Sequence, residues 1–434
     1  MMLDSLRIPF AFLRLVILAA LPLAGAPLLG QSAPPPQTDA PLLAAAPVPD
    51  EEFGEECTVG VACGKATPDG RPLLWKNRDA QKRDNVVTAF DDGKWPYVAV
   101  CDAGVRTTVW GGANAAGFCI MNSVSRDLPQ EEAKGPGNGG FMKLALRRCA
   151  TVADFAELLK ETDATGRTTR ANFGVIDAVG GAAIFETSHR AHRRFDADDT
   201  KNGIVVRTNF AFTADGKGGR ERFARADSLC TAVAAGTLTP SFLLERLLRD
   251  LQPPKSAIDG GEGRQDVRET LHRQTTVASM VFVGCKPGDD PKLTTMWAIV
   301  GQPLFGAAIP CFPATGKVSP LLAGSPKSRL CDLNLELQAA FYEQPPARED
   351  GEAPLEADQA GAVRWLRRDG LDEVLKQVLK HERAAMRHTQ EAMGRWRKAT
   401  KLDTDALYEL HAEAAMAAER LLVELVEQHV AAAK

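Results

Sequence analysis

Cys57 begins the part of the chain whose residues could perform a reaction. It follows a Pro/Ala-rich stretch and opens the hydrophobic segment CTVGVACG. Most cysteines in such segments are structural, so a catalytic role requires partner groups. Segments that could supply those partners follow in chain order. They are Lys76-Asn77-Arg78-Asp79, 114–118 leading into Asn122, 177–186 with Asp177 and Glu186, Arg207-Thr208-Asn209-Phe210 and Arg222-Phe223. Cys57 is therefore the candidate nucleophile, to be weighed against a structural thiol.

A cysteine at the first position of a mature chain carries both a nucleophile and a base. A free thiol has a pKa of about 8.5 and an α-amine one of about 7.7–8.0, so the amine can take the thiol proton directly or through water. No catalytic histidine is then required, and His189 and His192 are expected at a solvated basic edge. Because Cys57 is internal to the sequence, this chemistry requires a cut after Glu56.

The order of the short motifs resembles the choloylglycine hydrolase family and the related acyltransferases that act on 6-aminopenicillanic acid. Both are N-terminal-nucleophile hydrolases, and the resemblance covers about residues 57–300. The motifs are Cys57-Thr58, Asn77-Arg78-Asp79 at the end of a strand, Asn-x-x-Gly-Phe at 114–118, and Thr208-Asn209 after another strand.

The resemblance implies a role for each candidate. Cys57 would be the nucleophile and the mature N-terminus, and Asp79 would hydrogen-bond its free α-amine. The side-chain amide of Asn122 would stabilise the oxyanion, a contribution worth about 2.7–4 kcal/mol per donor in a protease example. Asn209 would position the nucleophile and the substrate carbonyl, and Arg222 would lie near the nucleophile.

Two further positions bear on this set. Lys76 stands where bile-salt-cleaving members have an arginine, so the positive charge is kept but bidentate hydrogen bonding is lost. Asn114 is expected to shape its turn and not to act in catalysis.

Short hydrophobic segments separated by turn residues predict a β-rich core. Residues 57–64 and 71–76 should form a hairpin around Thr67-Pro68-Asp69-Gly70. Further strands are expected at 86–90, 97–101, 118–122, 172–177, 182–186, 203–206, 276–283 and 294–300, with a Gly-rich turn at 111–117. Helical periodicity predicts two helices within 140–162 and others at 220–234 and 240–251. The pattern is α+β with largely antiparallel sheets, and the resemblance implies a four-layer αββα N-terminal nucleophile hydrolase sandwich.

The two ends of the chain differ in composition from the middle. Residues 1–32 are typical of a signal peptide, because their uncharged run is short for a membrane span; an uncleaved anchor is the alternative. Residues 33–56 predict a disordered spacer that serves as a propeptide. An amidase domain at 57–338 and a helical C-terminal extension at 339–434 follow. The extension should pack on the core, or else mediate dimerisation or partner binding.

The composition argues against several classes of protein. A net charge of −4 with 6% aromatic residues does not suit nucleic-acid binding. The nine cysteines include no CxxC pair, which argues against a structural zinc site. No metal or organic cofactor is expected. Export would permit disulfides, whose pairing the sequence does not give.

The predicted function is hydrolysis of a linear amide through a Cys57 thioester, with acyl transfer to an amine as a close variant. The substrate would be a small N-acyl amide or a peptide-like molecule. The protein would be exported to the periplasm or the cell exterior, without stable membrane insertion after signal removal, and self-association stays open. The alternatives are a Cys-type dipeptidase of the same fold and an exported, non-catalytic binding or scaffold protein that uses the C-terminal helices.

Overall fold

A computed structural model describes residues 55–257, 259–324, 326–343 and 365–430 of the 434-residue chain. The predicted signal peptide and all but the last two residues of the predicted spacer lie outside this part. Within it, no helix combines the length and the apolar character that crossing a bilayer requires.

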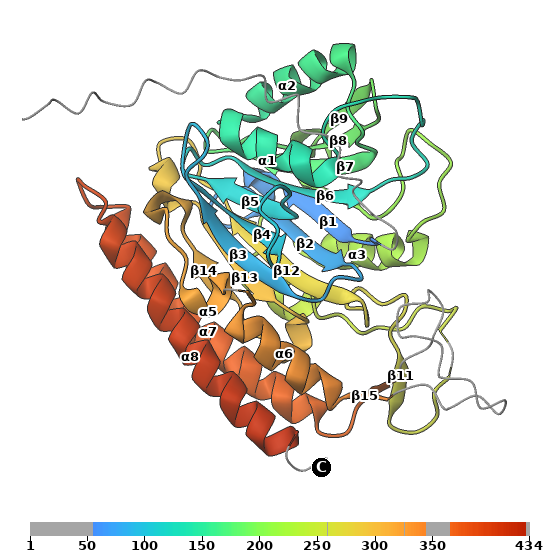
Figure 1. Ribbon diagram of the computed structural model, residues 1–434, viewed down its shortest axis with the longest axis vertical. Helices are drawn as coiled ribbons and strands as arrows, with labels where there is room; N and C mark the ends of the chain where they lie inside the picture. The colour runs from blue at the N-terminus through green and yellow to red at the C-terminus, as the bar shows by residue number, and fades with distance from the viewer. Residues whose placement is uncertain (1–54, 258, 325, 344–364, 431–434) are drawn as a thin grey trace, which may run out of the picture. The chain divides into compact units, whose positions relative to one another are not determined.

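Two antiparallel sheets form the centre of the fold (Figure 1). The six-stranded sheet contains, in spatial order, β10 (Ile204–Arg207), β1 (Thr58–Ala62), β2 (Leu73–Asp79), β12 (Thr276–Val283), β13 (Thr295–Val300) and β14 (Ile309–Cys311). The seven-stranded sheet follows chain order and contains β3 (Asn85–Phe90), β4 (Tyr97–Asp102), β5 (Gly111–Asn114), β6 (Cys119–Val124), β7 (Ala171–Ile176), β8 (Ala182–Thr187) and β9 (His192–Asp196).

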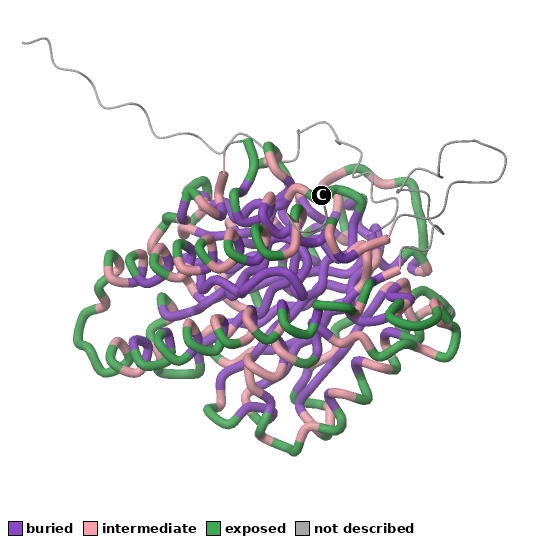
Figure 2. Tube along the Cα trace, turned by 90° about the horizontal axis from the view of Figure 1, so that it is seen from below, coloured by how far each residue is buried: buried purple, intermediate pink, exposed green. Residues whose placement is uncertain are grey.

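The inner faces of the two sheets pack against each other. Side chains alternate along a strand, so every second residue of β1 and β2 points to this interface. Val61 and Leu74 lie directly opposite each other across β1 and β2, and both belong to one buried cluster with Met121 and Ile184 of the other sheet. Purple, buried segments therefore run through the centre of Figure 2.

Helices cover the outer face of each sheet. On the seven-stranded sheet, α1 (Asn138–Arg148) and α2 (Val152–Thr165) bury Phe141 and Phe155 against Phe173. On the six-stranded sheet, α3 (Arg220–Ala232) and the segment that follows it pack against Trp75. The predicted α+β class and the four-layer αββα sandwich are confirmed.

The first hairpin forms as predicted, and a glycine makes its close packing possible. Thr58 pairs with Asn77 and Val59 with Lys76, so the end of β2 lies beside the start of β1. A Cβ atom added to Gly60 would lie 2.2 Å from the Trp75 ring, closer than atoms can approach. Gly60 thus lets the indole of Trp75 lie flat across β1.

Several sequence predictions for single elements are wrong. Residues 111–114, expected as a turn, form strand β5. A Cβ at Gly112 would lie 2.7 Å from the Val98 carbonyl oxygen, so the missing side chain is what allows this strand to pair closely. The helix predicted at 240–251 does form, but its predicted end is wrong: it consists of α4 (Pro240–Phe242) continued by the π-helical η3 (Leu243–Leu247).

The C-terminal part is helical, as predicted, and packs on the sandwich. Its helices are α5 (Pro320–Ala323), α6 (Arg329–Ala339), α7 (Leu371–Trp396) and α8 (Thr404–His429). α8 contacts α6 and β14, and α7 contacts α8 and the short helix η5 (Pro303–Phe305). The red α7–α8 hairpin in Figure 1 therefore covers one side of the domain.

A small third sheet precedes α7, and short 3-10 turns join other elements. The sheet is formed by β11 (Arg264–Asp266), β16 (Trp365–Arg367) and β15 (Tyr342–Glu343), so the extension predicted to be helical from residue 339 contains strands at 342–343 and 365–367. The remaining short turns are η1 (Gly64–Ala66), η2 (Ala197–Asp199), η4 (Pro291–Leu293) and η6 (Pro313–Thr315).

Candidate active site

Cys57 is fully buried, and two predicted site residues hold its backbone. Its N–H donates to Oδ1 of Asn209 at 2.9 Å, and its carbonyl oxygen accepts from Nη1 of Arg222 at 3.1 Å. Arg222 also donates from Nη2 to the same Oδ1 of Asn209 at 3.1 Å. The three residues form a closed hydrogen-bonded set around the start of β1.

Strand pairing and one glycine explain this placement. β10 runs antiparallel to β1 and pairs Arg207 with Val59, so Asn209, two residues beyond Arg207, comes level with Cys57. Arg222 lies in the first turn of α3. Gly219 precedes that helix at φ +69°, and a Cβ there would lie 2.6 Å from Nη2 of Arg222. The glycine leaves room for the guanidinium to reach Cys57.

Asp79 lies buried at the end of β2, with one carboxylate oxygen partnered and one not. Oδ1 accepts from the Thr276 hydroxyl at 2.7 Å. Oδ2 accepts no hydrogen bond from the described residues, although Nη1 of Arg273 is 3.8 Å away. Burial raises the pKa of Asp79 to about 6, against the opposing charges of Arg273 and Arg222. Oδ2 of Asp79 can therefore accept a hydrogen bond from an N–H or O–H group.

The side chain of Asn122 has its oxygen hydrogen-bonded and its nitrogen without a hydrogen-bond acceptor in the described part of the chain. Nζ of Lys76 donates to its Oδ1 at 2.8 Å and to the Trp110 carbonyl at 3.0 Å. The Nδ2 of Asn122 is buried and has no hydrogen-bond partner in the described part of the chain. Since buried amides are normally paired, a vacant donor indicates a site where a ligand atom can bind.

Two hydrogen bonds tie β6, the strand that carries Asn122, to the segment beside Cys57. Ser123 donates from its hydroxyl to the Thr208 carbonyl at 2.6 Å, and Nδ2 of Asn209 donates to the Val124 carbonyl at 3.0 Å. These bonds bridge the two sheets. They bring Asn122 to the same end of the sandwich as the nucleophile.

The electrostatic surroundings keep the Cys57 thiol protonated in this uncut chain. Burial raises its pKa to about 11. The positive charge of Lys76 lowers the pKa, while the negative charges of Glu55 and Asp79 raise it. Removing Glu55 would therefore make the thiolate easier to form.

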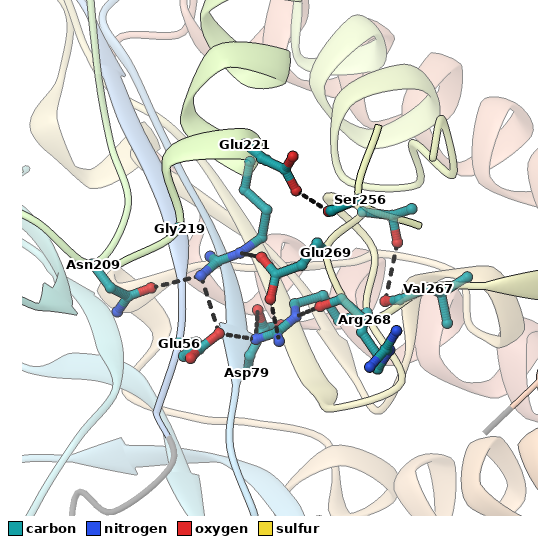
Figure 3. Close-up of polar contacts among 12 residues, drawn as sticks. Glu56, Asp79, Asn209, Gly219, Glu221, Ser256, Val267, Arg268 and Glu269 are labelled. Atoms are coloured by element: carbon teal, nitrogen blue, oxygen red, sulfur yellow. Dashed lines mark hydrogen bonds and ion pairs between the residues drawn. The ribbon is translucent and has the colours of Figure 1, made fainter. Parts of the chain in front are cut away.

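The last two residues of the predicted spacer are ordered within the site, so the prediction of disorder is wrong for them. Glu55 is buried and pairs with Arg78 at 3.1 Å. Oε2 of Glu56 accepts from Nη2 of Arg222 at 3.1 Å and from Nη1 of Arg273 (Figure 3). Burial works against ionisation, yet Arg273 and Arg222 hold the pKa of Glu56 below its ordinary value. Ion pairing fixes the chain on the upstream side of Cys57.

The structure brings all five predicted site residues to one end of the sandwich and adds others that the sequence did not reveal. Arg273 and Glu269 pair at 3.3 Å, and Glu269 also contacts Nε of Arg222 at 3.4 Å. Both come from the segment before β12, whose conformation the sequence does not determine. The only available signal was the charged stretch at 268–273, directly ahead of a predicted strand.

Other residues considered from the sequence have structural surroundings. Asn114 bonds the backbone of 116, 118, 146 and 149, as expected for a turn-shaping residue. Nδ1 of His192 contacts Asp163 at 2.7 Å on the edge strand β9, away from Cys57. All nine cysteines are buried free thiols. Among the described residues, no group of three His, Cys, Asp or Glu side chains is placed to hold a metal ion.

No protein-family model and no curated protein matches the chain. A Caenorhabditis elegans ortholog of N-acylethanolamine-hydrolyzing acid amidase matches its structure at 14% identity and a TM-score of 0.39, over 54% of this chain and 94% of that one. A mutant conjugated bile acid hydrolase from Clostridium perfringens matches at 14% identity and a TM-score of 0.36, over 56% of this chain and 89% of that one. Penicillin V acylase from Agrobacterium tumefaciens matches at 13% identity and a TM-score of 0.38, over 59% of this chain and 86% of that one.

Proposed function

We propose that this chain is a self-processed amidase, in which Cys57 becomes the N-terminal nucleophile and hydrolyses a linear amide through a thioester. One observation carries the proposal. The bond between Glu56 and Cys57 lies inside the cluster formed by Asp79, Asn209 and Arg222, with both flanking residues held by hydrogen bonds or ion pairs. The groups that would serve catalysis surround the bond that must first be cut.

Maturation would use the same atoms as turnover. Sγ of Cys57 adds to the carbonyl carbon of Glu56, the C–N bond breaks, and the thiol proton ends on the released amine. Water then hydrolyses the thioester, which frees the thiol and leaves the upstream segment with a new carboxylate. Asn209 accepts from the Cys57 N–H at 2.9 Å and would hold this amide in place during the attack.

In the mature protein the new α-amine would act as the base. It takes the thiol proton, and Sγ attacks the substrate carbonyl. Asp79 would hold the amine through its unpartnered Oδ2, and Nδ2 of Asn122 would donate to the oxyanion. The amine leaving group receives the proton, and water or a second amine accepts the acyl group. Export to the periplasm or the cell exterior belongs to this proposal, because the predicted propeptide follows a predicted signal peptide.

The mass of the mature chain and a set of cysteine variants test the proposal. Mature protein should begin at Cys57. Cys57→Ala should accumulate as precursor if cleavage is autocatalytic, or be trimmed but inactive if another protease cuts. Cys63→Ala, on the same side of the strand, is the matched control and should be processed and active. An active chain that retains Glu56 would exclude the α-amine as base, and a start near residue 33 would favour the scaffold alternative.

A further inference from the structure

The side chain of Glu56 occupies a cradle made by two arginines. Oε2 is shared by Arg222, whose side chain is fully buried, and Arg273, whose side chain is 12% exposed. The two guanidinium groups reach Glu56 from different elements, Arg222 from α3 and Arg273 from the segment before β12. The cradle is thus built into the fold and does not depend on neighbouring residues of the same strand.

Chemistry links this cradle to the substrate. In the proposed function, on which this inference rests, both maturation and turnover pass through an acyl thioester on Sγ of Cys57 beside a free α-amine. The two intermediates differ only in the acyl group. In maturation it is the upstream segment that ends in Glu56, and in turnover it comes from the substrate. The glutamyl side chain therefore shows where one part of a substrate acyl group can bind.

We propose that the mature site prefers amides whose acyl group ends in a carboxylate placed as in glutamate, namely glutaryl-type and glutamyl-type amides. The glutaryl group has the same carbon chain from its carbonyl to its terminal carboxylate as Glu56 has from its backbone carbonyl to Oε2. Its carboxylate would take the place of the Glu56 carboxylate between Arg222 and Arg273.

The charges that remain after maturation favour an anion at this place. Cleavage removes the carboxylate of Glu56, while Arg222 and Arg273 keep Glu269 between them at 3.4 and 3.3 Å. Arg126 is a third positive group whose charge acts on Glu56. An uncharged acyl chain would leave these guanidinium groups with one carboxylate fewer than in the precursor, and the loss of an ion-pair partner is costly in a desolvated site.

Two p-nitroanilides of equal chain length test the preference. Mature protein should cleave N-glutaryl-p-nitroanilide with a kcat/KM about 10- to 100-fold above that of N-pentanoyl-p-nitroanilide, as expected for one charge-assisted contact. Arg273→Gln should reduce this ratio toward one. Arg268→Gln is the control, because its side chain pairs locally with Asp266 at 2.8 Å, and it should leave the ratio unchanged.

Binding measured without turnover keeps the two proposals separable. Calorimetry should show glutarate binding to mature protein more tightly than the uncharged pentanamide, with the difference lost in Arg273→Gln. If both anilides are cleaved equally, the carboxylate preference is wrong and the amidase proposal stands. If glutarate binds no more tightly than pentanamide, the preference is wrong, and cleavage of either anilide decides the amidase proposal. If glutarate binds selectively but no amide is cleaved, the amidase proposal fails while the anion site remains.

Discussion

Nζ of Lys76 donates a hydrogen bond to Oδ1 of Asn122 at 2.8 Å, and this contact fixes which way the amide faces. An ammonium group can only donate, so the atom of Asn122 that faces Lys76 must be the oxygen. Nδ2 then points away from Lys76, and it has no hydrogen-bond partner among the described residues. A lysine at this position therefore has a defined task, even though it lacks the forked geometry of an arginine.

Removing the Asn122 amide should lower the rate of the reaction more than the stability of the fold. Asn122→Ala should lower kcat by about 10²–10³-fold if Nδ2 is an oxyanion donor. Its melting temperature should fall less than that of Asn114→Ala, because the substitution removes the bond from Lys76 to Oδ1 while Nδ2 makes no hydrogen bond within the described structure. Steady-state kinetics and thermal unfolding measure the two effects.

Asn114 provides the matched contrast, since its buried side chain bonds four backbone groups of the turn and of α1. Asn114→Ala should lower the melting temperature and leave the kcat of the folded fraction unchanged. An Asn122→Ala protein that is destabilised but retains full kcat would remove Asn122 from the mechanism.

Asn209 should control the rate of maturation. Its Oδ1 accepts from the Cys57 N–H and from Arg222, so Asn209→Ala loosens the amide that is to be cut. We expect precursor conversion to slow by about 10- to 100-fold, as misplacement of a reacting group can cost. Gel analysis of a time course follows it. Asn202→Ala, in the turn before β10, should convert at the wild-type rate; equal rates for both variants would contradict the role of Asn209.

Asp79 should make the precursor less stable as the pH rises. Its folded pKa is raised to about 6 from an ordinary 3.8, so the folded state binds the proton more tightly than the unfolded state. The free energy of unfolding should then fall between about pH 4 and pH 6, by at most ~3 kcal/mol from this group. Urea unfolding of a Cys57→Ala precursor, with and without Asp79→Asn, measures the difference. The Asn variant should be the more stable at pH 7, and parallel pH curves for the two proteins would refute the prediction.

A buried ion pair should anchor the C-terminal hairpin to the sandwich. Arg249, just after η3, donates to both carboxylate oxygens of Glu382 on α7 at 2.8 and 2.9 Å, and both side chains are almost fully buried. Glu382→Ala should reduce the free energy of unfolding by about 3–5 kcal/mol, since it leaves a buried charge alone.

The next residue along α7 is the control for that measurement. Arg383 pairs with Glu245 on the exposed surface, so Arg383→Ala should cost less than about 1 kcal/mol. Chemical denaturation of both variants decides whether the hairpin is an integral part of the domain. Equal, small losses would favour the alternative that the extension mediates dimerisation or partner binding.

The sequence was sufficient for the strands that carry their own turn signals and for the proximity of the candidate residues that lie next to them. The β1–β2 hairpin was predictable because its turn residues and its hydrophobic segments lie within one short stretch. β5 was not, because Gly111 and Gly112 have no strand preference and pair only once α1 and β4 close over them. The position of Arg273 was equally hidden, since it depends on β12 pairing with β2 across nearly 200 residues of chain.

The seven-stranded sheet ends at β9, where Arg193 and Arg194 are exposed. An edge strand offers unpaired backbone groups that another chain could extend. Arg194 pairs with Asp196 of the same strand at 2.6 Å. Long charged side chains on an edge strand oppose open-ended polymerisation of the sheet, and Arg193 and Arg194 supply them here. Replacing both arginines with threonine would keep the strand and remove these charges. The short length of β9 would then be the remaining feature of this edge that opposes fibril formation.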